Sequence, residues 1–340
     1  MSKTAVVLFN LGAPDSAAAV RPFLFSLFND PAIITLPQPL RWLVATFIAR
    51  RRAPVARAIY HRLGGGSPLL ANTQAQAAAL GDVLGADHRV FIAMRYWHPL
   101  SPDVAAAVRA WGADEVVLLP LYPQFSSTST GSSLAAWDKA AALADLAVPR
   151  RAICCYADEP GFIAAMAAEI ERSLARWPKG EPYRLLFSAH GLPQKTVAAG
   201  DPYQWQVGRT VAALRSALGA AARDSMICYQ SRVGPLAWLE PSTDAEIRRA
   251  GKDRVGVIIV PVAFVSEHSE TLVELDMEYR HLAESAGVPR YVRVATVGTA
   301  SDFIAGLARL VRSAPRPGPA PSNDRRLCPR EFGRCACASS

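Results

Sequence analysis

Short apolar runs rich in β-branched residues alternate along this chain with Ala-rich segments of helical period. The runs lie at 5–11, 89–94, 115–121, 151–156, 184–189, 225–230, 255–264 and 292–297. The helix-period segments lie at 72–84, 103–111, 133–146, 159–176, 204–220 and 242–250. Continuous apolar strands that alternate with helices are typical of parallel sheets covered on both faces. The pattern predicts an α/β fold with two similar domains and four strands in each.

The chain length and a change in composition near residue 314 set the expected domain boundaries. A chain of 340 residues is long enough for two domains of about 100 to 200 residues each. We expect an N-terminal α/β domain over 1–157 and a C-terminal α/β domain over 158–313. The remainder, 314–340, begins as a Pro-rich stretch that reads as a linker and ends in a tail with three cysteines.

Composition and charge narrow the class of protein only a little. A hydrophobic content of 51% with 19% charged residues is that of a folded globular protein. A formal net charge of +8 suits an anionic substrate, an anionic membrane surface or nucleic acid equally well. The N-terminus lacks the pattern of a secretory signal, which predicts a cytoplasmic protein.

The most membrane-like segment, 40–52, has an uncharged core over 42–49. This core is far shorter than the ~20 apolar residues that a spanning helix needs. The segment could lie on a membrane, cover a hydrophobic ligand, or form a buried helix with a basic end.

Polar residues that could bind a ligand follow several of the expected strands. In open α/β sheets, ligands bind outside the carboxyl ends of the strands. The residues at these ends include Arg95, Tyr96, His98, Ser126, His190, Gln230, Ser231, Trp238, Glu267, His268 and Glu270. Separated segments of the chain thus converge on one rim, where a ligand site is expected.

An acidic stripe follows the seventh strand, in the stretch SEHSETLVELDMEY. Glu267, Glu270, Glu274 and Glu278 are spaced by three and four residues, so they would line one face of a helix and repel one another. One alternative is a solvated helix face. The other is a mixed nitrogen and oxygen site with a nearby histidine, suited to ferrous iron or zinc and to proton transfer.

Two further motifs carry weaker signals. GGGSP at 64–68 lacks the Lys-Ser/Thr ending of a phosphate loop and follows a helical segment, so no nucleotide is expected. Cys328, Cys335 and Cys337 supply three soft thiolates, and Cys154 or Cys155 could complete the set for zinc or an iron-sulfur cluster. A disordered end with reactive thiols is the alternative.

Taken in order, these segments resemble the ferrochelatase family, whose members insert iron(II) into protoporphyrin IX to make haem. The motifs that carry the resemblance are LFNLGAP, RRRAPVARAIYHRLGGGSP, RYWHPL, YPQFSSTSTGSS, LLFSAHGLP, GDPYQWQV, YQSRVGPLAWLEP and PVAFVSEHSETLVELDMEY. The match runs from about residue 5 to residue 310 and continues into the tail. It implies two Rossmann-like domains, each with a four-stranded parallel sheet flanked by helices, in a chelatase-like fold.

The resemblance implies roles for individual residues. His190 and Glu270 would be the catalytic and metal-binding pair, on opposite sides of the porphyrin. His268, Glu274 and Glu278 would relay protons or metal along a helix that contains a π-type irregularity. Porphyrin contacts are implied for Arg52, Tyr60, Ser67, Arg95, Tyr96, Tyr203 and Trp238, and apolar residues of the lip segment 31–52 would cover the macrocycle.

Some ferrochelatases carry a 2Fe-2S cluster, for which the resemblance implies Cys155, Cys328, Cys335 and Cys337 as ligands. The tail spacing differs from that of animal enzymes, so the cluster stays a hypothesis. Ferrous iron is expected as a substrate.

The expected partners are protoporphyrin IX and ferrous iron, with no nucleic acid. Peripheral contact with the inner membrane and the choice between monomer and homodimer stay open. One alternative function is a chelatase for coproporphyrin or another tetrapyrrole. A different class of alternative is a non-catalytic haem or iron-sulfur sensor on the same fold.

Overall fold

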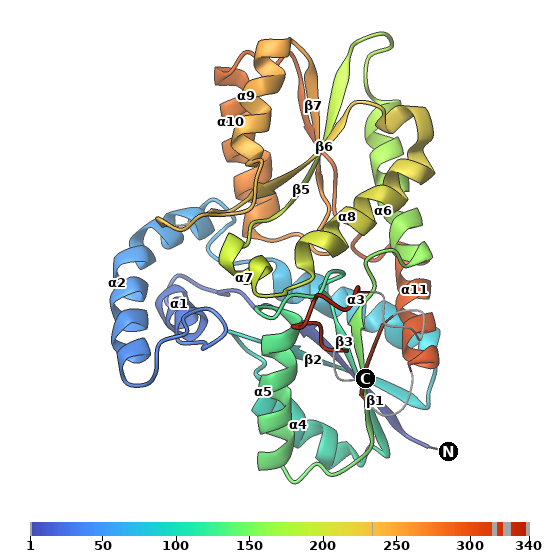
Figure 1. The fold of residues 1–340 in the computed structure, drawn as a ribbon. Helices are drawn as coiled ribbons and strands as arrows, with labels where there is room; N and C mark the ends of the chain where they lie inside the picture. The colour runs from blue at the N-terminus through green and yellow to red at the C-terminus, as the bar shows by residue number, and fades with distance from the viewer. Residues whose placement is uncertain (1, 233, 315–317, 322–327, 338–340) are drawn as a thin grey trace. The chain divides into compact units, whose positions relative to one another are not determined.

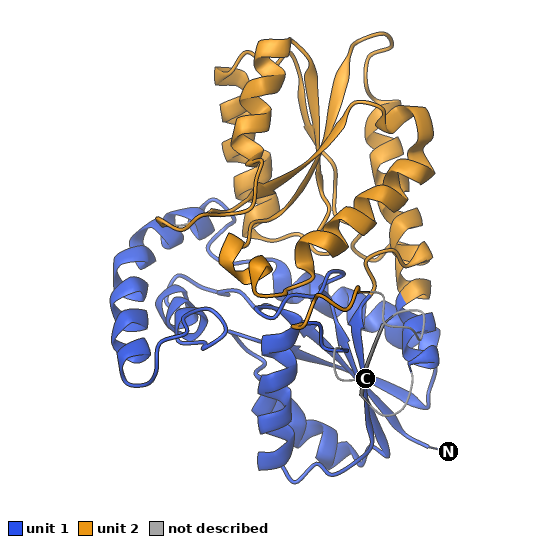
Figure 2. Cartoon of the chain, in the orientation of Figure 1, with its two compact units in different colours: residues 1–155, 307–327, 335–340 blue, residues 156–306, 328–334 orange. Residues whose placement is uncertain are grey.

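The computed structural model describes residues 2–232, 234–314, 318–321 and 328–337, and its fold is drawn in Figure 1. The chain divides into two compact units, coloured in Figure 2. Unit 1 comprises residues 1–155, 307–327 and 335–340, and unit 2 comprises residues 156–306 and 328–334. Among the residues of the expected tail, 315–317, 322–327 and 338–340 lie outside the described residues.

Unit 1 is built on a parallel sheet with the strand order β2-β1-β3-β4-β9. Its strands are β1 (Thr4–Asn10), β2 (His88–Met94), β3 (Glu115–Pro120), β4 (Arg150–Cys155) and β9 (Gly318–Pro321). Its helices are α1 (Val20–Phe28), α2 (Leu40–His61), α3 (Leu69–Leu84), α4 (Ser101–Trp111), α5 (Thr130–Leu143) and the second half of α11 (Ser301–Ser313). Every residue of β1 and β3 is buried, which explains why these strands read as unbroken apolar runs.

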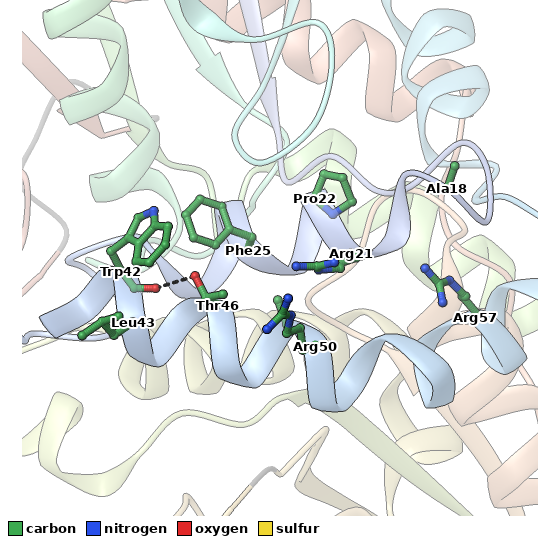
Figure 3. Close-up of a pocket in the computed structure, with 10 residues that line it drawn as sticks. Ala18, Arg21, Pro22, Phe25, Trp42, Leu43, Thr46, Arg50 and Arg57 are labelled. Atoms are coloured by element: carbon green, nitrogen blue, oxygen red, sulfur yellow. Dashed lines mark hydrogen bonds between the residues drawn. The ribbon is translucent and has the colours of Figure 1, made fainter. Parts of the chain in front are cut away.

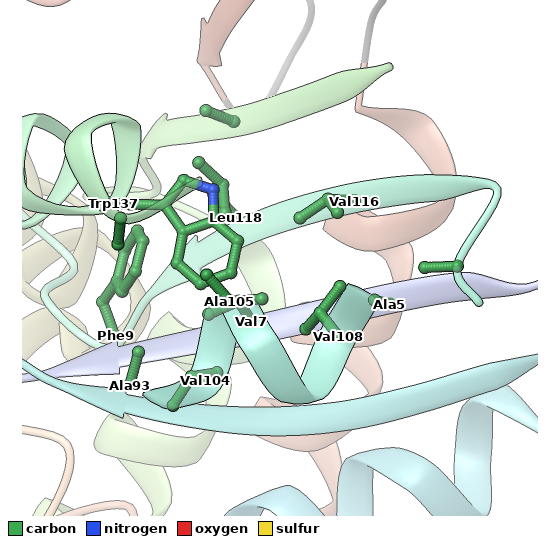
Figure 4. Close-up of a cluster of buried hydrophobic side chains, with 13 residues drawn as sticks. Ala5, Val7, Phe9, Ala93, Val104, Ala105, Val108, Val116, Leu118 and Trp137 are labelled. Carbon is green, nitrogen blue, oxygen red and sulfur yellow. The ribbon is translucent and has the colours of Figure 1, made fainter. Parts of the chain in front are cut away.

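A hydrophobic cluster on one face of this sheet is shown in Figure 4. Ala5, Val7 and Phe9 alternate along β1 and therefore point to the same face. There they pack with residues of α4 and with Trp137 of α5, whose ring centroid lies 6.1 Å from that of Phe9. The cluster fixes α4 and α5 on the sheet.

Unit 2 is built on a second parallel sheet with the strand order β6-β5-β7-β8. Its strands are β5 (Tyr183–His190), β6 (Ser225–Gln230), β7 (Gly256–Pro261) and β8 (Tyr291–Arg293). Its helices are α6 (Pro160–Ala175), α7 (Gln194–Ala198), α8 (Tyr203–Leu218), η1 (Gly219–Ala222), α9 (Thr243–Asp253), η2 (Glu270–Glu278), α10 (Tyr279–Ser285) and the first half of α11. The last expected strand, over 292–297, is shorter than predicted.

The predicted fold class is confirmed, since each unit holds a parallel sheet flanked by helices. Part of the stretch expected as a linker forms a strand instead, because β9 pairs in parallel with β4 at the edge of the first sheet. The sequence Gly-Pro-Ala-Pro of β9 is tolerated there because proline is compatible with an edge strand.

A buried ion pair explains why the end of α11 belongs to unit 1 and not to the expected domain 158–313. Arg151 of β4 donates to both carboxylate oxygens of Glu115, at 2.6 and 3.1 Å. Its Nη1 also donates to the main-chain carbonyls of Val311, at 3.1 Å, and Ala314, at 2.7 Å. Arg151 thus fastens the last turn of α11 to the first sheet.

The topology of unit 2 places several strand ends together. The chain leaves β5 for β6 on one side and later enters β7 on the other side of β5. Such a reversal in strand order opens a crevice at the carboxyl ends of the strands. His190 ends β5 and Gln230 ends β6 at this point, and a loop after β7 leads into η2.

Candidate active site

His190 and Glu270 meet at the carboxyl end of the second sheet. His190 is the last residue of β5 and Glu270 is the first residue of η2. Nδ1 of His190 lies 2.9 Å from Oε2 of Glu270, and the side chains are 38% and 25% exposed. Two residues that lie 80 positions apart in the chain thus form a direct pair at the expected rim.

The two groups shift each other's pKa. Burial by itself would lower the pKa of His190, but the charges of Glu270 and Glu274 outweigh burial and raise it. Burial would raise the pKa of Glu270, but the neighbouring His190, with His268 and Ser231, lowers it to about 2. The contact therefore favours the imidazolium form of His190 beside the carboxylate form of Glu270.

This contact differs from the arrangement that the resemblance implies, in which His190 and Glu270 lie on opposite sides of a porphyrin. Atoms 2.9 Å apart leave no space for a planar macrocycle between them. One of the two side chains must turn away before a ring can lie between them.

Glu274, one turn further along η2, is held by donors from the end of β6. Its Oε1 accepts from the main-chain N–H of Ser231 at 2.8 Å and from the hydroxyl of Tyr279 at 3.1 Å. Its Oε2 accepts from the hydroxyl of Ser231 and from Nε2 of Gln230, the latter at 3.2 Å. Burial and the charge of Glu270 nevertheless raise the pKa of Glu274. This carboxyl group is therefore better suited to hold a proton than Glu270 is.

Ser231 connects the two carboxylates. Its hydroxyl lies 3.4 Å from Oε2 of Glu270 as well as within hydrogen-bond distance of Glu274. Ser231 also has a φ of 62°, a left-handed conformation that non-glycine residues seldom adopt. Strained backbone of this kind is retained where the surrounding contacts enforce it, and it is concentrated at functional sites.

His268 approaches the same carboxylate from the loop that precedes η2. Its Nδ1 lies 3.0 Å from the main-chain carbonyl of Ser266, so Nδ1 carries the proton that makes this bond. Its Nε2 lies 3.9 Å from Oε2 of Glu270. The ring packs against Phe264, with centroids 4.7 Å apart. His268 is thus fixed with one nitrogen directed at the pair.

The acidic stripe divides into three parts. The segment Glu270–Glu278 is a π-helix, as the resemblance implies, and it places Glu270 and Glu274 at Ser231. Glu267 precedes the helix and accepts from Arg293 at 2.9 Å and from the N–H of Thr296 at 3.0 Å. Glu278 is exposed at the far end. The expectation of one continuous helical stripe from Glu267 to Glu278 is therefore wrong at Glu267.

Two imidazoles and two carboxylates in one place define the chemistry of this site. A neutral imidazole accepts a proton or ligates a borderline divalent metal, and carboxylates bind dications. The arrangement can therefore receive a divalent metal ion and remove protons from a bound molecule.

A second polar cluster lies in unit 1 at the carboxyl end of β2. Arg95 and Tyr96 follow this strand, and both donate to Oδ2 of Asp30 at 2.7 Å. The side chain of Arg95 is 22% exposed, whereas Tyr96 is buried. Tyr96 therefore supports the cluster, and Arg95 is the member that a ligand can reach.

The family model described as Ferrochelatase matches residues 3–314. The chain belongs to the ferrochelatase family. The Ferrochelatase of Caulobacter vibrioides (strain NA1000 / CB15N) is 52% identical over 345 residues, which cover 98% of this chain and 97% of the relative. The Ferrochelatase of Pelagibacter ubique (strain HTCC1062) is 43% identical over 350 residues, with 98% of both chains covered.

Solved structures with the same fold include chelatases of low sequence identity. The sirohydrochlorin chelatase SirB from Bacillus subtilis subspecies spizizenii, in complex with cobalt, is 11% identical with a TM-score of 0.54, covering 91% of this chain and 94% of that one. CbiX, described as the terminal enzyme for biosynthesis of sirohaem in denitrifying bacteria, is 18% identical with a TM-score of 0.51, covering 92% and 99%. These similarities support the fold alone.

Membership in the ferrochelatase family makes this chain an enzyme that inserts ferrous iron, as a substrate, into a porphyrin. The predicted ferrochelatase function and its place in haem biosynthesis are thereby confirmed. The alternative of a non-catalytic sensor has no support in the named relatives.

The other positions implied as porphyrin contacts differ in their accessibility within their own units. In unit 1, Arg52 is half-buried with its guanidinium 5.7 Å from the ring centroid of Phe28, and Tyr60 is buried. The Ser67 hydroxyl accepts from the N–H of Leu69 at 3.3 Å, at the start of α3.

In unit 2, Tyr203 is the buried first residue of α8, and Trp238 is half-buried. Burial, together with the nearby Tyr229 and Glu270, raises the pKa of the Tyr203 hydroxyl. A Cβ at Gly191 would meet the main-chain oxygen of Gln230 at 2.8 Å and the indole of Trp238 at 3.3 Å. Glycine after His190 thus lets the indole pack closely beside the site.

The lip segment 31–52 exposes apolar side chains in unit 1. Leu40, Leu43 and Phe47 of α2 are 53%, 55% and 64% exposed. Between α1 and α2 lies a cavity of about 990 Å³, lined by Phe25 and Trp42 among others and flanked by three arginines (Figure 3). Within the described residues, no helix is both long and apolar enough to cross a membrane.

Three cysteines come together in unit 1. The thiols of Cys154, Cys335 and Cys337 are buried and lie within 4.8 Å of one another. The internal member of this group is Cys154. Cys155, the internal ligand that the resemblance implies, is buried next to it, and the interaction between the two thiols is the first cause of the raised pKa of Cys154. Cys328 belongs to unit 2, where its sulfur accepts from Nε2 of Gln206 at 3.1 Å.

The cysteine group fits a thiolate-bound metal in its donor chemistry. Hydrogen bonding with the neighbouring thiols, together with burial, raises the pKa of Cys154 and of Cys337. Neighbouring buried thiols ionise only with difficulty by themselves, and a bound metal ion stabilises their thiolate forms. The group supplies three soft ligands, and a tetrahedral zinc or a 2Fe-2S cluster requires four.

Reasoning from sequence missed the residues that hold the functional groups in place. Gln230 and Ser231 were recognised as strand-end residues, but their bonds to Glu274 were not foreseen. Asp30 and Ser132 were not singled out. Asp30 directly precedes the lip segment 31–52 and Ser132 lies within the polar stretch 122–133, but nothing in their local sequence indicates that they meet Arg95.

Proposed function

We propose that the enzyme inserts Fe(II) into protoporphyrin IX, forming protohaem and releasing two protons, as a lyase in the last step of haem b biosynthesis. The observation that carries this proposal is the pair of His190 and Glu270 at the carboxyl end of β5. The exposed apolar side chains of α2 support a hydrophobic macrocycle as the ligand.

The proposed mechanism assigns complementary roles to the pair. A free-base porphyrin must lose two pyrrole protons, so the site needs a base that is neutral when the ring is bound. Glu270 favours the imidazolium form of His190, and a dication that binds Glu270 removes this stabilisation. The imidazolium then releases its proton to water, and the neutral imidazole can accept a pyrrole proton.

A second proton has a route through the neighbouring carboxyl group. The pKa of Glu274 is raised by burial and by Glu270, so this group takes up a proton more readily than Glu270 does. Glu278 lies exposed on the same helix and can release protons to water. His268 with its nitrogen directed at Glu270 is the remaining relay candidate.

The test is an insertion assay with ferrous iron or zinc, run with protoporphyrin IX and coproporphyrin side by side. We expect insertion into protoporphyrin to be preferred, and His190→Ala to abolish insertion while porphyrin binding persists. A preference for coproporphyrin would make the tetrapyrrole alternative correct. Insertion at the wild-type rate by His190→Ala would remove His190 from the mechanism.

The contacts proposed for the porphyrin are those that the resemblance implies. Arg95 and Arg52 are the cationic members and would bind carboxylate substituents of the ring. Tyr60, Ser67, Tyr96, Tyr203 and Trp238 complete the set. The burial of Tyr60, Tyr96 and Tyr203 favours a supporting role for these three residues.

A metal centre in the tail is a separate proposal. Cys154, Cys335 and Cys337 would hold a 2Fe-2S cluster or another thiolate-bound metal, which would add cross-links between β4 and the tail. The predicted ligands Cys328 and Cys155 are tested with them. Anaerobically purified protein should show the visible absorption of a ferric sulfide centre, and Cys335→Ser should lose it. Cys154→Ser, Cys155→Ser and Cys328→Ser, compared one by one, identify the remaining ligands by loss of the same absorption. Wild-type protein without this absorption would rule out the cluster.

The location of the enzyme is also a proposal. We place it in the cytoplasm, with peripheral contact to the inner membrane through the exposed apolar residues of α2. Co-sedimentation with anionic vesicles should be lost when Leu43 and Phe47 are both replaced by serine. Equal sedimentation of this variant and the wild type would contradict the contact.

A further inference from the structure

Asp30 is the centre of a buried polar cluster that joins three elements of unit 1. The residue follows α1, and its partners come from the loop after β2 and from the first turn of α5. Only 4% of Asp30 is exposed. Its Oδ2 accepts from Nη2 of Arg95 and from the hydroxyl of Tyr96, both at 2.7 Å, and also from the hydroxyl of Ser132. Its Oδ1 accepts from the N–H of Ala32 at 2.8 Å.

Arg95 is fixed on three sides by this cluster. Besides its bond to Asp30, its Nε donates to the hydroxyl of Ser132 at 2.6 Å. Its guanidinium carbon lies 4.8 Å from the ring centroid of Tyr96. The residue is 22% exposed, and no partner of its Nη1 is found among the described residues. One edge of the guanidinium is therefore held, and another is left for a ligand.

The position of this edge favours a carboxylate as the ligand. Arg95 is the first residue after β2, at the end of the sheet where ligands of open α/β folds bind. A guanidinium matches a carboxylate in plane and spacing, and a fixed one loses little entropy on binding. The Asp30 charge reduces the long-range attraction for an anion, but a guanidinium already held in the geometry of a carboxylate pair gains more in binding than this charge removes.

We propose that Asp30 is a positioning residue that orients Arg95 to recognise a carboxylate substituent of the porphyrin. This inference rests on the proposed contact between Arg95 and the substrate. Asp30 itself does not touch the ligand. It acts by holding the guanidinium, with Ser132 and Tyr96 as its supports.

The test compares protoporphyrin IX with its dimethyl ester, which has the same ring but no carboxylates. Binding is followed by fluorescence quenching, and metal insertion by kcat/KM with zinc. In the wild type the free acid should be preferred. Asp30→Asn keeps the size of the side chain and removes its charge, and should reduce this preference about ten-fold while ester binding stays unchanged. Ser132→Ala, which removes one support of Arg95, should reduce the preference by a smaller factor.

The matched control is Asp138→Asn, the same substitution in an exposed ion pair of α5 with Arg150. It should leave the preference for the free acid unchanged. If Asp30→Asn weakens acid and ester equally, Asp30 only stabilises the fold and the proposal fails. An unchanged preference in a folded Asp30→Asn or Ser132→Ala variant, checked by circular dichroism, also overturns it.

Failure of the underlying contact has a different signature. Arg95→Ala should reduce the preference for the free acid at least as much as Asp30→Asn does, while Arg52 accounts for the remainder. If Arg95→Ala retains this preference, Arg95 does not contact the carboxylate and the porphyrin contact proposed for it is wrong. If Asp30→Asn retains the preference and Arg95→Ala does not, Arg95 contacts the carboxylate but the role proposed for Asp30 is wrong.

Discussion

At the scale of single residues, the pair of His190 and Glu270 sets the pH behaviour of the site. Burial lowers the pKa of an imidazole, and the charges of Glu270 and Glu274 oppose this effect at His190. Without the charge of Glu270, only Glu274 opposes it. We expect Glu270→Gln to lower the pKa of His190, as measured by NMR titration of the histidine side chains. A pKa that stays at the wild-type value would show that Glu270 does not control His190.

The same shifts determine how the pair contributes to stability. The folded-state pKa of His190 is raised above its ordinary value of 6.5. Protonated His190 therefore contributes fully to the free energy of unfolding below pH 6.5, and this contribution is lost as the pH rises through the folded-state pKa. The folded-state pKa of Glu270 is lowered from 4.5 to about 2. Ionised Glu270 therefore contributes fully to the free energy of unfolding above pH 4.5, and this contribution is lost as the pH falls toward 2. The difference in Tm between wild type and Glu270→Gln should therefore be largest between pH 4.5 and 6.5.

Ser231 offers a way to separate function from stability. Ser231→Ala removes the hydroxyl that binds Glu274 and lies near Glu270 but keeps the left-handed backbone. Ser231→Gly removes the hydroxyl and relieves a left-handed backbone that costs an L-residue about 1 to 2 kcal/mol, a gain reduced by the roughly 0.5 to 1 kcal/mol of extra unfolded-state entropy of glycine. Both variants should raise the KM for zinc by roughly ten- to a hundred-fold, since one charge-assisted hydrogen bond is worth about 1.5 to 3 kcal/mol.

Two measurements check this prediction. Urea denaturation should show Ser231→Gly as the more stable variant, and steady-state kinetics should show the same KM defect in both. If glycine restores wild-type kinetics, the strain and not the hydroxyl is what matters at this position.

The residues of the site differ in how well their position and role can be predicted from the sequence. His190 and Glu270 could be predicted because each stands just after a buried apolar strand and within a motif of the family. Ser231 could be predicted as a strand-end residue but not in its role, because its left-handed φ and its bonds to the π-helix arise only when β6 and η2 pack together. Asp30 is similar, since its partner Arg95 lies 65 positions away.

At the scale of elements, β4 carries two adjacent arginines in opposite environments. Arg151 and its partner Glu115 are 9% and 5% exposed, whereas Arg150 and Asp138 are 43% and 48% exposed. Removing one partner of a buried pair costs about 3 to 5 kcal/mol, and an exposed pair is worth about 0 to 1 kcal/mol. We expect Arg151→Leu to lower the free energy of unfolding by the larger amount and Arg150→Leu by the smaller.

Urea denaturation of the two variants measures this difference. Hydrogen exchange should also rise in the last turn of α11, because Arg151 binds the carbonyls of Val311 and Ala314. Equal losses of stability for the two variants would mean that the buried pair contributes no more than the exposed one.

Most elements could be predicted from the hydrophobic pattern, and the exceptions have physical causes. Interior strands such as β1, β3 and β7 are buried on both faces and therefore appear as unbroken apolar runs. The edge strand β9 carries prolines and follows no such pattern, because its pairing depends on β4 alone. The adjacent residues Cys154 and Cys155 give no sequence signal for which thiol joins Cys335 and Cys337, and the pairing of β4 with β9 is irregular at this point.

At the scale of the whole molecule, the tail contributes residues to both compact units. Within unit 2, the rings of Phe332 and Trp205 lie 5.9 Å apart, and the N–H of Arg334 donates to the carbonyl of Gly200 at 3.1 Å. Within unit 1, the Cys335 and Cys337 thiols lie beside that of Cys154. The segment first expected as a tail after two complete domains is thus part of the folded structure of each.

The position of these contacts links the tail to the candidate site of unit 2. Gly200 and Trp205 flank Tyr203, the first residue of α8, and the pKa of Tyr203 is affected by Glu270. Loss of the tail would expose the indole of Trp205 and free the start of α8. Loss of the tail should therefore disturb Tyr203 beside the candidate site as well as lower the stability of the fold.

Truncation of the chain after residue 327 tests this role. Hydrogen exchange should rise at the start of α8, because Phe332 and Arg334 are lost, and at the end of β4, because the partners of Cys154 are lost. Phe332→Ala in the full chain is the matched variant, and it should raise exchange in α8 but leave β4 protected. If truncation raises exchange at β4 alone, the contacts of Phe332 and Arg334 do not hold α8, and the tail serves only the first unit.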